Sequence, residues 1–415
     1  MNVTVILEHR FIQTPDRAVW TQTMFPYSFW QRYLEVFDGV KVVARILPVT
    51  EAPPDWIRAD GEGVSLIAVP YYIGPKQYLL KAFSVKQAVR NAVSLNDAVI
   101  LRVSSQLAIE IQPFLQRTRH PYGVEVVADP YDVFAPGAVK HPLRPLFRWL
   151  FPRQLRRICA DATAAAYVTE RALQHRYPPG INSFSTHCSD VELPDSAFVS
   201  VPRTPRQESG LLTLIYVGTM DQLYKAPDLL IDAVATGASE GLNLKLIMVG
   251  DGKHRSELEA RAAKLGVAER VCFLGWLPAG DAVRAQLDGA DLFVLPSHQE
   301  GLPRAMVEAM ARALPCIGST VGGIPELLSD EDLVPPGDVA ALAGKIRAVV
   351  TNPERMARMS ARNLHKARGY SDRVLHQRRI EFYRYVREKT EAWLKTQNTD
   401  PRGVKNPLSA SSSSV

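Results

Sequence analysis

The sequence predicts a two-domain α/β protein in which each domain is a doubly wound parallel sheet and the domains face a cleft. Three observations support this prediction. The length of 415 residues exceeds what one hydrophobic core commonly serves. Apolar runs of strand length alternate with helical patterns, regularly in the second half and less regularly in the first. The runs are apolar throughout, which is typical of strands covered by helices on both faces.

The first domain is predicted to span residues 1–205. Its expected strands are Val3–Leu7, Val40–Ile46, Val64–Val69, Ala98–Val103, Val124–Ala128 and Ala164–Val168. Its expected helices lie near Tyr27–Phe37, Tyr78–Val93, Leu107–Arg117 and Pro145–Ala160. The segment Val199–Gly210 is rich in proline and charge, so we expect a hinge linker there.

The second domain is predicted to span residues 206–370. Its expected strands are Leu211–Gly218, Leu244–Gly250, Arg270–Trp276, Ala290–Pro296 and Pro315–Thr320. Its expected helices lie near Ala226–Ala235, His254–Leu265, Asp281–Leu287, Pro303–Ala313, Val339–Val350 and Pro353–Ala367. Residues 371–396 are predicted to form a helix that packs back on the first domain. The tail, residues 397–415, is polar and predicted to be disordered.

Composition narrows the class of protein. Hydrophobic residues make up 46% and charged residues 22%, which is ordinary for a globular chain, and the net charge of +6 suggests an anionic ligand or surface. The four cysteines form no CxxC pair, so neither a zinc site nor a redox motif is indicated, and a reducing cytoplasmic setting fits. The chain shows no signal-peptide pattern at its start and no apolar run of about 18 residues, so no membrane span is expected.

The segment LPSHQEGLPRAMVEAM, residues 295–310, is the most informative part of the chain. It follows an apolar strand, and Pro303 opens the helix after it, a position where no backbone donor is needed. Glu300 and Glu308 lie on either side of that helix start. A helix N-terminus attracts phosphate, and carboxylates bind sugar hydroxyls, so the segment suits a nucleoside-diphosphate ligand. Alone, it equally fits a surface helix with two solvated glutamates.

Glycines and a lysine lie at the expected strand ends, where ligands of such sheets bind. Gly218 ends one strand and Lys225 follows it, so the backbone there could approach a ligand and the lysine could meet a diphosphate. Gly250 and Gly252 follow the next strand. The Gly322-Gly323 pair follows a later one and could turn its N–H groups to phosphate. A solvated loop lysine and ordinary tight turns are the alternatives.

Together and in this order, the segments resemble the C-terminal half of the family 4 glycosyltransferases, which have the two-domain GT-B architecture. The resemblance covers about Leu211 to Ser371 and rests on the glycine-to-lysine loop, GDG, FLGWLP, LPSHQEGLPRAMVEAMA, GGIPELL and LVPPGD. It implies transfer of a hexose from a UDP- or GDP-linked sugar, with retention, without metal or other cofactor. The leaving phosphate would assist deprotonation of the acceptor.

The resemblance also implies roles for individual residues. Glu300 and Lys225 would be catalytic, with Glu300 and the backbone after it facing the donor sugar and Lys225 neutralising the departing diphosphate. Glu308 would hold the ribose hydroxyls, and the loop containing Leu277 would contact the base. The implied donor-binding residues are Gly218, Thr219, Lys225, Gly250, Gly252, Leu277, Glu300, Gly301, Leu302, Pro303 and Glu308.

Two departures from the family pattern concern charge and the first domain. Thr219 stands where members commonly carry arginine, and Arg304 is a candidate to replace that positive charge. The first-domain loop EHRFIQTPDRAVW lacks paired glycines, and His9 and Arg10 in it are candidates for acceptor or phosphate contact. Asp129 stands where members often have histidine. It could orient the sugar or acceptor, although a turn-forming aspartate before Pro130 is the favoured interpretation.

The segment Lys140–Arg157, KHPLRPLFRWLFPRQLRR, interleaves basic and aromatic residues and has no acidic one. This pattern suits peripheral contact with an anionic membrane at its cytoplasmic face. Pro142, Pro145 and Pro152 are expected to interrupt a long helix, and buried aromatics with solvated arginines are the alternative. Nucleic-acid binding is not expected, because no nucleic-acid-binding motif accompanies the charge.

The sequence therefore predicts a retaining glycosyltransferase that acts on a glycan or a lipid-linked glycan, in a cell-surface polysaccharide pathway. The alternatives are a sugar-nucleotide epimerase or hydrolase on the same fold, and a non-catalytic binding module.

Overall fold

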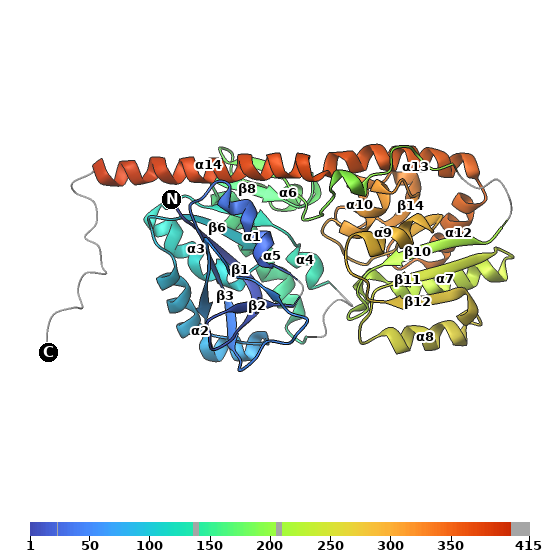
Figure 1. Cartoon of the computed structure of the whole chain (residues 1–415), viewed down its shortest axis with the longest axis horizontal. Helices are drawn as coiled ribbons and strands as arrows, with labels where there is room; N and C mark the ends of the chain where they lie inside the picture. Colours follow the sequence, from blue (N-terminus) through green and yellow to red (C-terminus); the bar gives the residue numbers. More distant parts are fainter. Residues whose placement is uncertain (23, 136–140, 205–209, 400–415) are drawn as a thin grey trace.

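The structure is a computed structural model that describes residues 1–22, 24–135, 141–204 and 210–399. Figure 1 shows two lobes side by side, the first built from the N-terminal half and the second from the C-terminal half. The long helix α14 (Asp372–Thr399) comes after the second lobe and runs along one side of the first. Each lobe contains a mainly parallel sheet with helices packed on it, which confirms the predicted fold class.

The first domain contains a nine-stranded sheet. Its parallel part has the order β5–β3–β1–β6–β7–β8–β9, and β2 and β4 add an antiparallel edge to the end of β1. The strands are β1 Val3–Gln13, β2 Val19–Thr21, β3 Val40–Pro48, β4 Ile57–Arg58, β5 Val64–Val69, β6 Ala98–Val103, β7 Gly123–Val126, β8 Ala164–Tyr167 and β9 Phe184–His187.

Helices cover both faces of this sheet. The helices are α1 Tyr27–Leu34, α2 Gly74–Ala92, α3 Gln106–Thr118, α4 Pro130–Val133, α5 Arg144–Asp161 and α6 Ala172–Arg176. On one face, α2, α3 and α5 contribute Val85, Ile111 and Leu155 to a common apolar core. On the other face, α1 and α14 contribute Trp30 and Tyr383 to a second core. Helix α14 therefore completes the first domain although it follows the second in sequence.

The second domain contains a six-stranded, fully parallel sheet of order β12–β11–β10–β13–β14–β15. The strands are β10 Leu212–Val217, β11 Leu244–Val249, β12 Val271–Gly275, β13 Leu292–Leu295, β14 Cys316–Ser319 and β15 Leu333–Val334. The helices are α7 Pro227–Ser239, α8 Arg255–Lys264, α9 Asp281–Asp288, α10 Arg304–Ala311, α11 Ile324–Leu327, α12 Val339–Val350 and α13 Pro353–Ala367. Each predicted strand and helix of this domain is present, and the two-residue β15 was not foreseen.

The predicted end of the first strand at Leu7 is wrong, because β1 continues to Gln13. Arg10 pairs with Arg45 of β3 after a register shift, and Ile12 pairs with Trp20 of β2. The residues taken for a loop therefore belong to the sheet. The polar residues Glu8 to Arg10 interrupt the apolar run, but Phe11 and Ile12 after them are both buried.

Two further boundaries differ from the prediction. Pro145 lies at the start of α5 and Pro152 lies inside it, yet the helix is continuous over 18 residues. The prolines therefore do not interrupt it; Lys140 lies outside the described residues. Helix α14 extends to Thr399, so the first residues of the expected disordered tail are helical. Residues 400–415 lie outside the described part of the chain.

Candidate functional site

A buried ion pair lies at the carboxyl ends of the adjacent strands β10 and β13. Lys225 ends a short 3-10 turn after β10, and Glu300 lies in the loop between β13 and α10. The lysine Nζ is 2.6 Å from Glu300 Oε1, and the side chains are only 15% and 7% exposed. Ser297 donates a hydrogen bond to the same oxygen at 2.9 Å. The structure thus brings together the two residues predicted to be catalytic, where a parallel sheet places its ligands.

The glycines beside this pair leave room for closely packed loops. A Cβ on Gly218 would lie 2.6 Å from the Cδ of Lys225. Gly250 has a φ of +131°, and its Cβ would lie 2.0 Å from the carbonyl oxygen of Gly218. Gly252 has a φ of +153°, and a Cβ there would lie 2.2 Å from the backbone nitrogen of Asp221. Packing between the loops after β10 and β11 therefore requires glycine at these positions, and their contact with a donor stays a prediction.

Gly322 and Gly323 support the loop that carries Glu300. A Cβ on Gly322 would lie 1.9 Å from the carbonyl oxygen of Glu300. The N–H of Gly323 donates to the carbonyl oxygen of Gly301 at 2.6 Å. That N–H is therefore already used, and the alternative of a tight turn describes this pair better than a phosphate cradle. Leu302 and Pro303 are buried, and Pro303 directly precedes α10.

Glu308 lies on α10, a turn after Arg304. Burial raises the pKa of the Glu308 carboxyl, and the nearby Arg304 and Arg284 act in the opposite direction. Burial raises the pKa of Tyr224, the neighbour of Lys225, and the exposed Arg304 lies close enough to oppose that rise. Arg304 is therefore near Glu308 and near the loop that carries Lys225. Its role as a substitute cation stays a prediction.

Thr219 and Leu277 show no feature that singles them out as ligand contacts. The hydroxyl oxygen of Thr219 accepts a hydrogen bond from the N–H of Asp221 at 3.2 Å and shapes the turn after β10. Leu277 is partly buried against the domain core, while Trp276 beside it is 68% exposed. Their donor contacts stay predictions.

The two domains meet at the Glu300 loop. A Cβ on Gly301 would lie 3.3 Å from the carbonyl oxygen of Val127, just after β7, and 3.7 Å from the side chain of Val168, just after β8. The carboxyl ends of the first-domain strands therefore face the Lys225–Glu300 pair across the domain boundary.

Among the first-domain candidates, Asp129 has a structural role. It is buried and accepts a hydrogen bond from the N–H of Tyr131 at 2.9 Å, which caps α4. The hydroxyl of Tyr177 donates to the same oxygen, Oδ1, and the other oxygen, Oδ2, pairs with Arg176. The favoured interpretation of a turn-forming aspartate is confirmed. The carboxylate is already bound within its own domain, and an orienting role for the sugar or acceptor stays a prediction.

His9 is held between aromatic rings and not at a strand end. Its ring centroid lies 4.5 Å from that of Phe11 and 4.9 Å from that of Phe25, and Nε2 is 3.1 Å from the hydroxyl of Thr21. Burial, assisted by Arg45 and Arg10, lowers the pKa of His9 to about 4. The ring is therefore neutral at pH 7 and offers no positive charge to phosphate. Arg10 is exposed, and its contact with an acceptor stays a prediction.

Sequence reasoning missed Glu326, which joins the two domains. Its carboxylate is buried and accepts hydrogen bonds from the backbone N–H groups of Glu170 at 2.6 Å, Arg171 at 2.8 Å and Ala172. Lys366 of α13 also pairs with Glu170, at 3.1 Å. The segment GGIPELL contains Glu326, but nothing local indicates partners more than 150 residues away.

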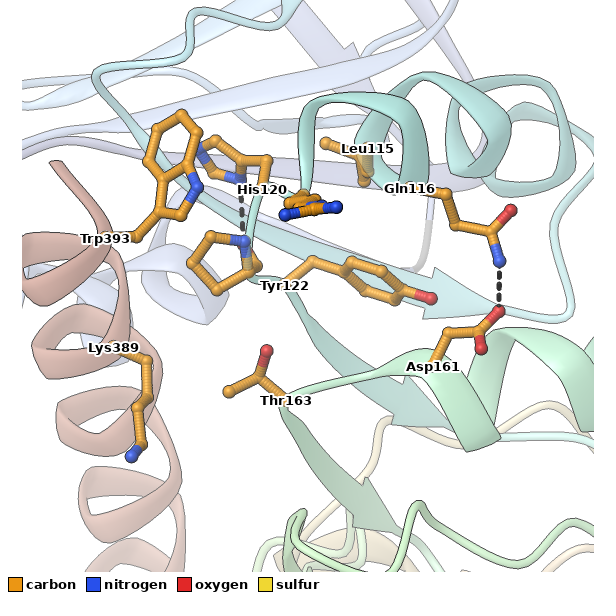
Figure 2. Close-up of a pocket in the computed structure, with 10 residues that line it drawn as sticks. Leu115, Gln116, His120, Tyr122, Asp161, Thr163, Lys389 and Trp393 are labelled. Atoms are coloured by element: carbon orange, nitrogen blue, oxygen red, sulfur yellow. Dashed lines mark hydrogen bonds between the residues drawn. The ribbon is translucent and has the colours of Figure 1, made fainter. Parts of the chain in front are cut away.

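A cavity of about 450 Å³ lies away from this site, between α3, the residues just before β7, the end of α5 and α14 (Figure 2). At its rim Gln116 donates to Asp161, and the ring of Trp393 packs 4.7 Å from that of His120. The cavity shares no residue with the Lys225–Glu300 pair, so it forms no part of the candidate site.

Within the described residues, no helix combines the length and apolar character needed to cross a membrane.

Comparison with known proteins agrees with this architecture. Sucrose-phosphate synthase from Thermosynechococcus elongatus superposes with a TM-score of 0.67 at 15% identity, over 94% of this chain and all of that one. Anabaena HepE, solved in complex with UDP, superposes with a TM-score of 0.59 at 16% identity, over 95% of this chain and all of that one. Protein CapJ of Staphylococcus aureus is 26% identical over 350 residues, which are 84% of this chain and 86% of that protein.

The fold is that of the GT-B glycosyltransferases, and the chain is a transferase enzyme. More particularly, residues 203–366 match the model of the family "Glycosyl transferases group 1". The resemblance found in the motifs between Leu211 and Ser371 is thereby confirmed.

Proposed function

We propose that the chain transfers a hexose, with retention and without a metal ion, from a UDP- or GDP-linked sugar to a hydroxyl of a glycan or lipid-linked glycan. The setting proposed is cell-surface polysaccharide synthesis at the cytoplasmic face of a membrane. The observation that carries the proposal is the Lys225–Glu300 pair at the carboxyl ends of β10 and β13. The UDP complex of HepE, which has the same fold, supports a nucleotide donor.

The geometry suits departure of a diphosphate. In the proposed reaction the bond between the sugar C1 and the phosphate oxygen breaks, and the acceptor oxygen bonds to C1 on the same face. The acceptor proton passes to the departing phosphate. Negative charge develops on that phosphate, and a cation held in a buried site stabilises it more than it would in water. Lys225, fixed by Glu300, supplies that cation, and the start of α10 supplies a favourable dipole.

A lipid-linked acceptor is supported by the exposed face of α5. Leu146 and Trp149 are 49% and 54% exposed in its first half, and Arg153, Arg156 and Arg157 are exposed in its second half. Phe147 and Phe151 fit the alternative of buried aromatics in part, because they are half-buried and pack on Phe134 with ring centroids 5.5 and 5.3 Å away. The segment therefore divides into an anchored face and an exposed face that suits a membrane.

The proposal is tested by incubating the protein with UDP- and GDP-hexoses, a panel of glycan and lipid-linked acceptors, and EDTA. We expect one donor to give a glycoside whose anomeric configuration, read by NMR, matches that of the donor. Free altered sugar without any acceptor product would instead identify an epimerase or hydrolase. An inverted anomer, or activity abolished by EDTA, would contradict the proposed mechanism.

Glu308→Ala is expected to weaken nucleotide binding. A carboxylate that holds ribose hydroxyls forms charge-assisted hydrogen bonds, so the loss should be about 1.5–3 kcal/mol. Because burial raises the pKa of Glu308, affinity should also fall as the pH drops through a value above the ordinary 4.5, where the carboxylate is protonated. Calorimetric titration of UDP and GDP at several pH values measures both effects. Equal affinity of the wild type and Glu308→Ala would contradict the ribose assignment.

A further inference from the structure

Helix α2 exposes large apolar side chains that the fold does not use. Leu79, Leu80 and Phe83 are 72%, 88% and 82% exposed, and Ile73, just before the helix, is 53% exposed. The opposite side of the helix is already anchored, with Val85 and Val89 buried in the domain core. Single exposed apolar residues are ordinary, but a contiguous group of this size marks an interaction surface.

The charge of α2 indicates the chemistry of what covers this group. The helix GPKQYLLKAFSVKQAVRNA carries Lys76, Lys81, Lys86 and Arg90, all exposed, and no acidic residue. Cations around an exposed apolar stripe complement an anionic lipid surface, where the apolar groups enter the acyl boundary and the cations meet the headgroups.

The placement of α2 connects this surface to α5. Helix α2 packs on α3, and α3 packs on α5, so all three cover the same face of the first-domain sheet. Both α2 and α5 start beyond the carboxyl ends of parallel strands, β5 and β7, and the exposed apolar residues of each lie in its first half. Their outward faces therefore point to the same side, and their apolar parts lie toward the end of the domain that meets the Glu300 loop.

We propose that α2 is a lipid-docking helix that, with α5, seats the first domain on an anionic membrane. Leu80 and Phe83 enter the acyl boundary, and Lys76, Lys86 and Arg90 contact the anionic headgroups. The inference rests on the proposed function in one respect: docking on a membrane would bring the enzyme to a lipid-linked acceptor.

The test is sedimentation of the full chain with vesicles of phosphatidylcholine alone or mixed with phosphatidylglycerol. We expect binding to the mixed vesicles and little to phosphatidylcholine alone. The double variant Leu80→Glu/Phe83→Glu should bind the mixed vesicles at least about tenfold more weakly, because buried apolar area and favourable charge are both lost. Its substitutions are on the surface, so circular dichroism and thermal unfolding should match the wild type.

A matched control replaces two exposed apolar residues elsewhere, Ile181→Glu/Leu265→Glu, and should bind vesicles like the wild type. Neutralising Arg153, Arg156 and Arg157 should weaken binding as well, because α5 shares the surface. Undiminished vesicle binding by Leu80→Glu/Phe83→Glu would overturn the proposal. So would light scattering that shows a wild-type dimer split by this variant, because a second copy would then cover the helix. Vesicle binding by a protein that transfers no sugar would support the inference and contradict the proposed function.

Discussion

Lys225→Ala is expected to lower kcat by about 10²–10³-fold, the usual effect of removing one preorganised group that stabilises charge in the transition state. Lys225 lies in a buried pair, 2.6 Å from Glu300, so it is held in place before the diphosphate departs. KM for the donor should change less than kcat, because the charge on the leaving group is largest in the transition state. Steady-state kinetics with the donor identified by the transfer assay measure both constants.

Lys253→Ala is the matched control, because Lys253 is an exposed lysine in the loop after the neighbouring strand β11. It should retain wild-type kcat. Removal of Lys225 also leaves Glu300 without its cation, so Lys225→Ala/Glu300→Gln is compared with Glu300→Gln alone, which isolates the loss of the lysine charge. A Lys225→Ala enzyme with kcat within about twofold of the wild type would contradict the assignment of Lys225 to the leaving group.

Arg102→Met is expected to destabilise the first domain by about 3–5 kcal/mol, the usual cost of removing one partner from a buried charge network. Arg102 pairs with Glu125 at 2.7 Å and with Asp190, and its side chain is 5% exposed. Tyr33 and Tyr383 donate to Glu125 at 2.9 and 3.1 Å, so the network links β6, β7, α1 and α14. Urea unfolding followed by circular dichroism measures the loss.

The same network predicts how the stability depends on pH. Burial alone would raise the pKa of Asp190, but Arg102 and Arg32 lower it below the ordinary 3.8. A carboxyl with a lowered folded-state pKa stabilises the fold above its unfolded pKa, and this contribution is lost as the pH falls below that value.

The control for Arg102→Met is Arg58→Met. It breaks an ion pair whose arginine is 50% exposed, and should cost less than about 1 kcal/mol. An equally small loss for Arg102→Met would contradict the structural role of the network.

The second domain could be predicted closely because its strands are continuous apolar runs buried on both faces. Strands such as β10 and β13 satisfy that pattern, and the turns between them have recognisable glycines and prolines. The first domain was harder. Strand β1 carries His9 and Arg10 through its middle, and its last residues join the sheet through the short strands β2 and β4. Local composition therefore suggested a loop where tertiary pairing makes a strand.

The site was predicted where its residues are close to a strand end and missed where contacts are long-range. Lys225 and Glu300 belong to adjacent strands of one parallel sheet, so the fold class itself brings them together. Glu326 binds the backbone of the other domain, and Arg102 meets Asp190 88 residues away, which no spacing pattern reveals. Burial is equally invisible in the sequence: it makes His9 neutral and commits Asp129 to its own domain.

The most direct test of the account is a thermal-shift titration of the wild type and Lys225→Ala with UDP, GDP, ADP and their sugars, in EDTA. A ligand that binds the folded state raises its apparent stability. The account predicts a clear rise in Tm with UDP or GDP and its sugar for the wild type, and a smaller rise for Lys225→Ala. No rise with any nucleotide in a well-folded wild-type sample would contradict the donor site at Lys225 and Glu300.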